Sequence, residues 1–302
     1  MDLKSKIILI SGPTASGKSN FSIKLAKKIN GEIINADSMQ VYKELKILSA
    51  RPDPQNYQKI THHLYGFHNV KKSFSTGDWI KLAIKKINEL KKRKKTPIFV
   101  GGTGLYFKAL TDGMVSIPNI PNKLREKIRL LHKKIGSKNF FLKLIKIDPL
   151  VKDQMNASDT QRSIRAYEIK LFTKKSMYEW FKGTKSDYDK KDFYKIYIDF
   201  PRKELLKRIS NRAEQMIKKG AITEVKKFIK LKITKNKSAQ KAIGISEIKE
   251  HLRKKTEIAD MIDKISIKTR QYAKRQSTWA RGNMINWFKL QPLKINKFLK
   301  NI

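Results

Sequence analysis

The stretch Gly12–Ser19 constrains the fold of this chain more than any other part of the sequence. It has the spacing of a phosphate-binding loop, in which a glycine and four further residues precede Gly-Lys-Ser. An apolar run at 7–10 comes before it, and a helical pattern at 18–29 comes after it. We therefore predict a loop that joins a buried strand to the N-terminus of a helix, where free backbone N–H groups and the helix dipole favour an anion. The loop residues are Gly12, Pro13, Thr14, Ala15, Ser16, Gly17, Lys18 and Ser19.

Such a loop predicts a bound phosphate or diphosphate group, as in nucleotide-binding proteins that hold ATP. Lys18 can reach the terminal phosphate oxygens, and the Ser19 hydroxyl can bind Mg²⁺. The motif leaves open which molecule donates the phosphates and which molecule receives a transferred group. A small-molecule or nucleoside kinase that uses ATP is one function it allows.

The length and composition of the chain exclude several other classes of protein. With 302 residues the chain can bury a sizeable core in one or two domains. It has no cysteine, which excludes a disulfide framework and a cysteine metal site. No apolar stretch approaches the length of a membrane span, and the N-terminus lacks the apolar centre of a signal peptide. We expect a soluble, cytoplasmic protein with no membrane partner.

The chain is strongly basic, with 69 Lys and Arg against 26 Asp and Glu and a formal net charge of +43. A compositional bias toward Lys, Ile and Asn could produce much of this charge without any function. A polyanionic partner, meaning nucleic acid, is the other explanation. The stretch 268–281 mixes basic and aromatic residues, which suits phosphate contact and base stacking and favours the second explanation.

The order of the expected elements indicates an α/β core with a helical insertion. Strands and helices alternate at first, but from 122 to about 183 the pattern is helical and basic with no clear strand. We predict a P-loop NTPase-like (nucleotide-kinase-like) core with a parallel sheet flanked by helices in residues 1–120 and 190–302, and an all-helical domain in residues 121–189. The expected core strands are 5–11, 32–36, 97–100, 195–199 and 285–288, and the main core helices are 18–29, 78–92, 202–219, 221–231 and 257–280.

Polar residues follow the expected strands at the edge where open α/β sheets bind ligands. Asp37 follows the second strand, Thr103 follows a glycine pair after the third, and Asp199 ends a later strand. A carboxylate near the loop could bind Mg²⁺, cap a helix or act as a general base, and spacing does not choose between Asp37 and Asp199. The pair His62-His63 invites a metal site, but neighbours in an extended segment point to opposite faces, which favours a structural or substrate-loop role.

Stretches along nearly the whole chain resemble the tRNA dimethylallyltransferase family, also called isopentenyl transferases. The phosphate loop is widely shared among proteins, whereas the blocks Asp37–Tyr42 and Lys274–Gln276 are far more specific. Two departures are Ser49-Ala50-Arg51, where Thr-Ala-Lys is usual, and Ile245, where the family usually has an aromatic residue. The matching stretches are Gly12–Ser19, Asn35–Tyr42, His62–Leu64, Val100–Tyr106, Asp159–Ala166, Arg208–Gly220, Ala242–Gly244 and Thr269–Trp279.

The resemblance implies transfer of a dimethylallyl group from dimethylallyl diphosphate to N6 of adenosine 37, in tRNAs that read codons starting with U. The products are N6-(dimethylallyl)adenosine and pyrophosphate. Lys18, Ser19 and Mg²⁺ would neutralise the charge that grows on the pyrophosphate. Arg212 would also hold the diphosphate, Asp37 would accept the proton from N6, and Thr103 would hydrogen-bond near the reacting groups. The adenine must leave the anticodon-loop stack to react.

The resemblance also implies a tRNA interface, and we expect the protein to be a monomer. The helical insertion would grip the anticodon stem-loop through its shape and exposed bases. The residues expected to contact tRNA are Asp37, Ser38, Met39, Gln40, Thr103, Arg125, Gln161, Arg162, Ser163, Ile164, Arg165, Lys274, Arg275 and Gln276.

Two other functions are alternatives to prenyl transfer. The first is the ATP-dependent small-molecule kinase, against which the basic helical insertion and the lack of a recognisable arginine lid argue. The second is a non-catalytic RNA-binding NTPase, which predicts that replacing Asp37 spares all activity.

Overall fold

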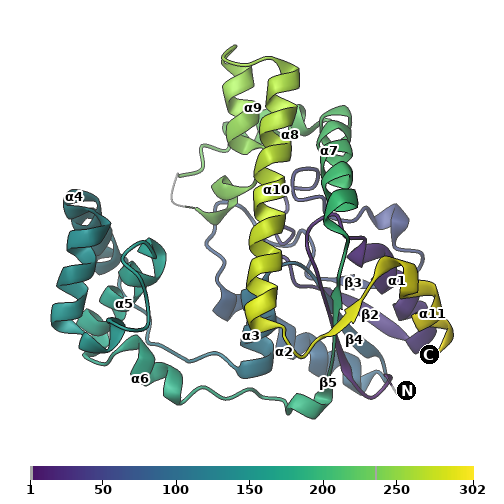
Figure 1. Cartoon of the computed structure of the whole chain (residues 1–302), viewed down its shortest axis with the longest axis horizontal. Helices are drawn as coiled ribbons and strands as arrows, with labels where there is room; N and C mark the ends of the chain where they lie inside the picture. Colours follow the sequence, from purple (N-terminus) through teal and green to yellow (C-terminus); the bar gives the residue numbers. More distant parts are fainter. Residues whose placement is uncertain (1–2, 235–236) are drawn as a thin grey trace. The chain divides into compact units, whose positions relative to one another are not determined.

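The computed structural model describes residues 3–234 and 237–302. The chain divides into two compact units, Met1–Thr111 with Tyr188–Ile302 and Asp112–Asp187. The first unit is an α/β core and the second is helical (Figure 1). The sequence predicted the helical domain over residues 121–189, whereas the second unit spans Asp112–Asp187.

The first unit is built on one six-stranded sheet in the order β3-β2-β4-β1-β5-β6. Every pairing in it is parallel, which confirms the predicted fold class. β1 therefore lies inside the sheet, between β4 and β5, and carries the phosphate loop at its carboxyl end. The strands are β1 Ile7–Ser11, β2 Gly31–Asn35, β3 His62–His63, β4 Thr96–Val100, β5 Phe193–Ile198 and β6 Phe288–Leu290.

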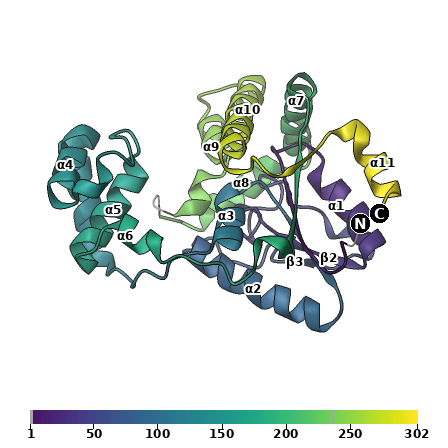
Figure 2. The same cartoon turned by 60° about the horizontal axis from the view of Figure 1, so that its bottom comes forward.

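Strands β1, β2 and β4 are buried along their whole length, because helices cover both faces of the sheet. Ile7 and Leu9 face one layer, formed by α2 (Thr76–Lys92), α3 (Gly104–Asp112) and the end of α10 (Ile258–Asn283). Ile8 and Ile10 face the other, formed by α1 (Lys18–Ile29) and α11 (Ile295–Lys300). Figure 2 shows α11 beside α1, close to the chain ends.

A third group of helices follows the core strands in the sequence and packs around the segment after β2. α7 and α10 lie side by side (Figure 1). Val41, Tyr42 and Leu45 from the segment after β2 share a core with α8 and α9. These helices are α7 Arg202–Lys218, α8 Ala221–Lys230, α9 Ile245–Leu252 and α10 Ile258–Asn283.

The second unit has three α-helices and, among its residues, no strand: α4 Asn122–Ile147, α5 Thr160–Thr173 and α6 Met177–Lys182. Asp159 caps α5 by accepting a hydrogen bond from the Arg162 N–H. Gly136 interrupts α4 with a φ of 75°, so the helix bends there. Phe140 and Tyr167 lie in the shared core of α4 and α5.

The helix predicted over 18–29 is confirmed at both ends, and the last strand is found two to three residues later than predicted, at Phe288–Leu290. The two-residue strand β3 and the terminal helix α11 are among the elements that were not predicted. Short 3-10 turns occur at Pro54–Asn56, Pro149–Val151, Lys190–Asp192, Ser238–Lys241 and Pro292–Lys294. Over the described ranges, no helix has the length and apolar character that crossing a membrane requires.

Candidate active site

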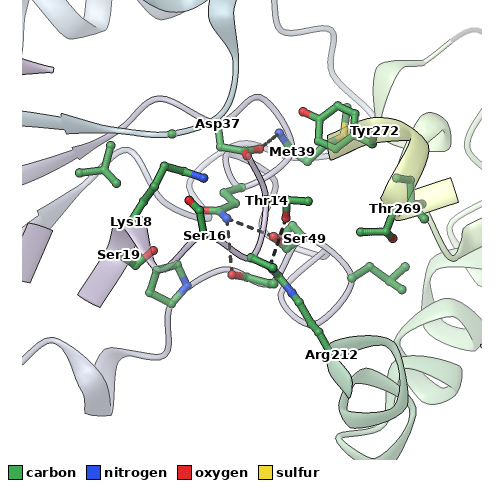
Figure 3. Close-up of a pocket in the computed structure, with 18 of the residues that line it drawn as sticks. Thr14, Ser16, Lys18, Ser19, Asp37, Met39, Ser49, Arg212, Thr269 and Tyr272 are labelled. Carbon is green, nitrogen blue, oxygen red and sulfur yellow. Dashed lines mark hydrogen bonds between the residues drawn. The ribbon is translucent and has the colours of Figure 1, made fainter. Parts of the chain in front are cut away.

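A cavity of about 920 Å³ opens at the carboxyl ends of the central strands, and its lining comes wholly from the first unit. The phosphate loop after β1, the segment 37–40 after β2 and the end of β4 form one side of it. α7 and α10 contribute further polar groups (Figure 3). Lys18, Asp37 and Arg212 thus meet around one cavity, although they are far apart in the sequence.

The phosphate loop takes the conformation that its glycines permit. Gly17 is the N-cap of α1 with a φ of 84°, a left-handed conformation that side chains other than glycine rarely adopt. A Cβ on Gly12 would lie 2.9 Å from the Ile198 carbonyl oxygen, so the loop runs close against β5. The Ser16 hydroxyl is buried and has no hydrogen-bond partner in the described structure. The loop therefore offers an anion a free hydroxyl beside the N-terminus of α1, where helix N–H groups point outward.

Lys18 folds back onto the phosphate loop. Its Nζ donates hydrogen bonds to the carbonyl oxygens of Gly12, at 2.8 Å, and Pro13, at 2.6 Å. Burial lowers the pKa of Lys18 to about 7, the Asp37 charge opposes this, and the Arg212 charge adds to it. The amine is therefore held in place, and a bound anion would favour its charged form.

Asp37 follows β2 and is fixed by its neighbours. Asn35 holds the backbone of Asp37 with two hydrogen bonds, of 2.9 Å from the Asp37 N–H and 3.0 Å to its carbonyl. Asp37 Oδ1 accepts a 2.9 Å bond from the Met39 N–H, and its carboxylate faces the same space as the Lys18 amine (Figure 3). Burial raises the pKa of Asp37, while the Met39 N–H and the charges of Lys18 and Arg212 oppose that rise.

The two carboxylates that the sequence left open are now distinguished by position. Asp37 is among the residues that line the cavity, and Asp199 is not. Thr103 lies beside the Asp37 segment, since its Oγ1 accepts a 2.9 Å bond from the Ser38 N–H. The structure therefore brings Asp37, Ser38 and Thr103 together next to the phosphate loop.

α7 places two arginines against the phosphate loop. Arg212 Nη1 donates a 3.1 Å bond to Thr14 Oγ1, and Arg208 Nη1 lies 3.5 Å from the Ala15 carbonyl oxygen. Arg208 was not among the expected site residues. Its spacing of four residues from Arg212 was the available signal, because residues at that spacing share one face of a helix.

α10 reaches the same loop through Gln276. The Gln276 Oε1 accepts a 2.8 Å bond from the Thr14 N–H, and its Nε2 donates a 3.0 Å bond to the Gly102 carbonyl. Its side chain therefore bridges the phosphate loop and the turn between β4 and α3. Lys274 and Arg275 are exposed, and Arg275 lines the cavity with its guanidinium 5.9 Å from the Tyr272 ring centre.

Gln40 and Glu224 hold the segment 46–50, part of which lines the cavity. The Gln40 amide donates to the Ser49 carbonyl at 3.1 Å. The Glu224 carboxylate, on α8, accepts bonds from three successive backbone N–H groups, those of Lys46, Ile47 and Leu48. The Gln40 amide nitrogen is thus occupied within the protein, although Gln40 and Met39 both line the cavity.

In the helical unit, the expected tRNA-contact residues are divided between surface and core. Gln161 and Arg162 are exposed, and Arg125 and Arg165 are partly exposed. Ser163 and Ile164 are only 2% and 9% exposed and lie in the core of that unit. Their contact with tRNA stays a prediction, although α5 turns both side chains inward.

The histidine pair takes part in packing. His63 Nε2 lies 2.7 Å from the buried Glu32 carboxylate, and the His62 ring stacks on Tyr57 with centroids 3.6 Å apart. Within residues 3–234 and 237–302, no group of three or more His, Cys, Asp or Glu could hold a metal ion.

The charges around the cavity favour an anionic ligand. Asp37 and Asp53 are its acidic lining residues, against a larger set of cations. These cations come from the phosphate loop, α7, α10 and the turn before α9: Lys18, Arg208, Arg212, Arg275 and Lys241. A diphosphate with two or more negative charges would be stabilised here, and the apolar surface of Ile23, Val100 and Ile209 could accommodate a hydrocarbon group beside it.

Comparisons with known proteins point to one family. The family model described as IPP transferase matches residues 40–283. A tRNA dimethylallyltransferase of Pelagibacter ubique is 57% identical, over all of this chain and 96% of its own length. One of Rickettsia massiliae is 41% identical, over 99% of this chain and 83% of its own.

Two solved structures resemble this one along almost the whole chain. The full-length tRNA isopentenylpyrophosphate transferase of Bacillus halodurans has a TM-score of 0.69 at 32% identity and covers 98% of this chain and 95% of its own. A eukaryotic dimethylallyltransferase, described as acting on tRNA, has a TM-score of 0.81 at 29% identity and covers 95% of this chain and 74% of its own.

Proposed function

The chain belongs to the IPP transferase family, and we propose that it transfers a dimethylallyl group from dimethylallyl diphosphate to N6 of adenosine 37 in tRNA. The observation that carries this proposal is one cavity in which a cationic phosphate loop and the half-buried carboxylate of Asp37 face the same space. The loop would hold the leaving group, and the carboxylate would meet the nucleophile.

At the donor end, the phosphate loop and its cations would bind the diphosphate. Lys18 would exchange its bonds with the loop carbonyls for bonds with phosphate oxygens, and Arg212 and Arg208 would add planar, forked donors. When the allylic C–O bond breaks, its electron pair stays with pyrophosphate. These cations would stabilise that growing charge, which lowers the barrier.

At the acceptor end, Asp37 would act as the general base. The amine N6 forms a bond to the allylic carbon and loses a proton, which the carboxylate would take up. Asp37 Oδ1 already accepts the Met39 N–H, which orients the carboxylate toward the cavity where it would take up this proton. The target adenine would enter after leaving the anticodon-loop stack, next to Thr103 and Ser38.

We propose that Mg²⁺ binds together with the diphosphate, held by the Ser19 hydroxyl. Mg²⁺ takes oxygen ligands and usually combines one or two protein groups with substrate phosphates. The exposed Ser19 hydroxyl and the unpartnered Ser16 hydroxyl fit that donor set. When bound, the ion would supply further positive charge to the leaving pyrophosphate.

We place the reaction in the cytoplasm, where an enzyme that modifies tRNA would find its substrate. We also propose that the enzyme works as a monomer. The acceptors would be tRNAs that read codons starting with U.

The test is mass spectrometry of tRNA nucleosides after incubation of the protein with unmodified tRNA, dimethylallyl diphosphate and Mg²⁺. We expect N6-(dimethylallyl)adenosine, found only when the donor is present, and one pyrophosphate released per modified base. ATP replacing the donor should give no product. ATP-dependent phosphorylation of a nucleoside, without any prenylated adenosine, would overturn the proposal.

A further inference from the structure

A buried carboxylate in the helical unit gathers three arginines around it. Glu168, on α5, has a side chain only 2% exposed. Arg165 Nη1 lies 3.2 Å from its carboxylate, Arg125 Nε lies 3.4 Å from it, and Arg129 Nε lies 3.9 Å from it. The three arginine side chains are 39%, 36% and 45% exposed. The acid is thus inside the protein and the three cations reach the surface.

Helix geometry explains why these four residues meet. Arg125 and Arg129 are four residues apart on α4, so they share one face. Arg165 and Glu168 are three residues apart on α5, which packs against α4. The two helix faces therefore place three guanidinium groups around a single carboxylate.

The cluster holds more positive charge and more donors than folding requires. A buried carboxylate needs a partner, but one arginine would neutralise it, whereas three leave a net charge of plus two. Three guanidinium groups carry about fifteen N–H donors, against about four acceptor positions on one carboxylate. Most of these donors remain available to another anion at the surface.

We infer that Glu168 positions Arg125, Arg129 and Arg165 as a binding site for backbone phosphates of the tRNA, an inference that rests on the proposed function. The forked guanidinium donors fit phosphate oxygens, and Glu168 holds together cations that would otherwise repel one another. α4 has lysines and arginines along its length and one acidic residue, Glu126, which suits a polyanion better than a small metabolite. Arg129 and Glu168 were not among the residues expected to take part in tRNA binding.

Glu168→Gln gives the sharpest test, because the two explanations predict opposite signs. The change removes a negative charge, so nonspecific attraction alone predicts tighter tRNA binding. If Glu168 orders the arginines, the affinity for tRNA should instead fall by about fivefold or more, with the affinity for dimethylallyl diphosphate unchanged. Filter binding of tRNA and calorimetry of the donor measure the two affinities on the full chain. Equal or tighter tRNA binding by this variant overturns the inference.

A second pair of variants keeps the test decisive if Glu168→Gln disturbs folding. Arg129→Ala changes a partly exposed side chain, and Lys152→Ala removes the same charge from an exposed position in the same unit. We expect Arg129→Ala to weaken tRNA binding more than Lys152→Ala and to reduce its salt dependence by about one phosphate contact. Equal effects of the two variants would contradict the inference. If the wild-type protein itself fails to bind tRNA, the proposed function fails first and this inference falls with it.

Discussion

Burial acts in opposite directions on the two charged groups at the centre of the cavity. It raises the pKa of Asp37 and lowers that of Lys18 to about 7, so each group is shifted toward its neutral form. The mutual attraction of the two charges opposes both shifts without cancelling them. A bound diphosphate would favour the charged lysine again, so the donor itself would help to prepare the site.

The role of Asp37 can be separated from that of a general negative charge. Asp37→Asn keeps the shape and removes the base, so turnover should fall by about 100-fold or more. Binding of tRNA should weaken far less. In the wild type, turnover should rise with pH through the raised pKa of Asp37, because only the carboxylate form accepts the proton. Single-turnover kinetics on tRNA measure these effects.

Asp199→Asn is the matched control for that experiment. Asp199 follows β5 and does not line the cavity, so its replacement should leave turnover close to the wild-type value. Near-normal turnover in Asp37→Asn, or an equal loss in Asp199→Asn, would reject the assignment of Asp37 as the base.

Lys18 should make donor binding depend on pH. Its lowered pKa means that the ammonium loses its proton as the pH rises through about 7, and the diphosphate prefers the charged form. Affinity should therefore be full below about pH 7 and fall above it, by up to about tenfold per pH unit. Calorimetry with dimethylallyl diphosphate from about pH 6 to about pH 9 measures this.

Lys18→Arg supplies the control for this pH dependence. The guanidinium stays charged across that range, so the fall should be absent or much smaller. The ionisation of the ligand contributes equally to both pH profiles. Only the difference between the two profiles therefore reports the protonation of Lys18. Parallel profiles would show that the lysine is not responsible.

At the scale of elements, the sequence predicted the helices better than the directions of their side chains. Both ends of the helix at 18–29 were predicted correctly, because Gly17 precedes its first residue and Asn30-Gly31 follows its last. Which face of α5 or α10 is buried depends on tertiary packing, so the inward turn of Ser163 and the bridge made by Gln276 were missed. The strand β3 is too short to give a periodic signal.

The bridge made by Gln276 leads to a prediction about donor binding. Gln276→Met removes both hydrogen bonds, to Thr14 and Gly102, and should loosen the phosphate loop without removing a reacting group. We expect the KM for dimethylallyl diphosphate to rise by about threefold to tenfold, with a smaller change in kcat. Gln271→Met, at an exposed position of the same helix, should behave like the wild type.

The sequence suggested a different role for Gln276, namely contact with tRNA. That role predicts a weaker affinity for tRNA in Gln276→Met and an unchanged KM for the donor. Steady-state kinetics with each substrate varied in turn distinguishes the two roles.

At the scale of the whole molecule, composition left the origin of the net charge of +43 undecided. The arrangement of the charges helps to decide between a compositional bias and a polyanionic partner. Cations line the cavity of the α/β unit, and three arginines surround Glu168 in the helical unit. Both sites hold more positive charge than their acidic residues need. A compositional bias alone does not place arginines around one buried acid. We therefore infer that part of the positive charge serves to bind a polyanion.

The salt dependence of binding tests this assignment for the whole chain. If about six backbone phosphates are contacted, the affinity for tRNA should fall on the order of 10³-fold between about 50 mM and about 200 mM salt. Binding of dimethylallyl diphosphate, which involves a few charges in a shaped cavity, should change much less. An anticodon stem-loop whose base 37 is not adenine should keep the steep salt dependence but give no product. A shallow salt dependence of tRNA binding, or equal affinity for any duplex of the same length, would contradict this assignment. The excess positive charge would then be explained by the composition of the chain.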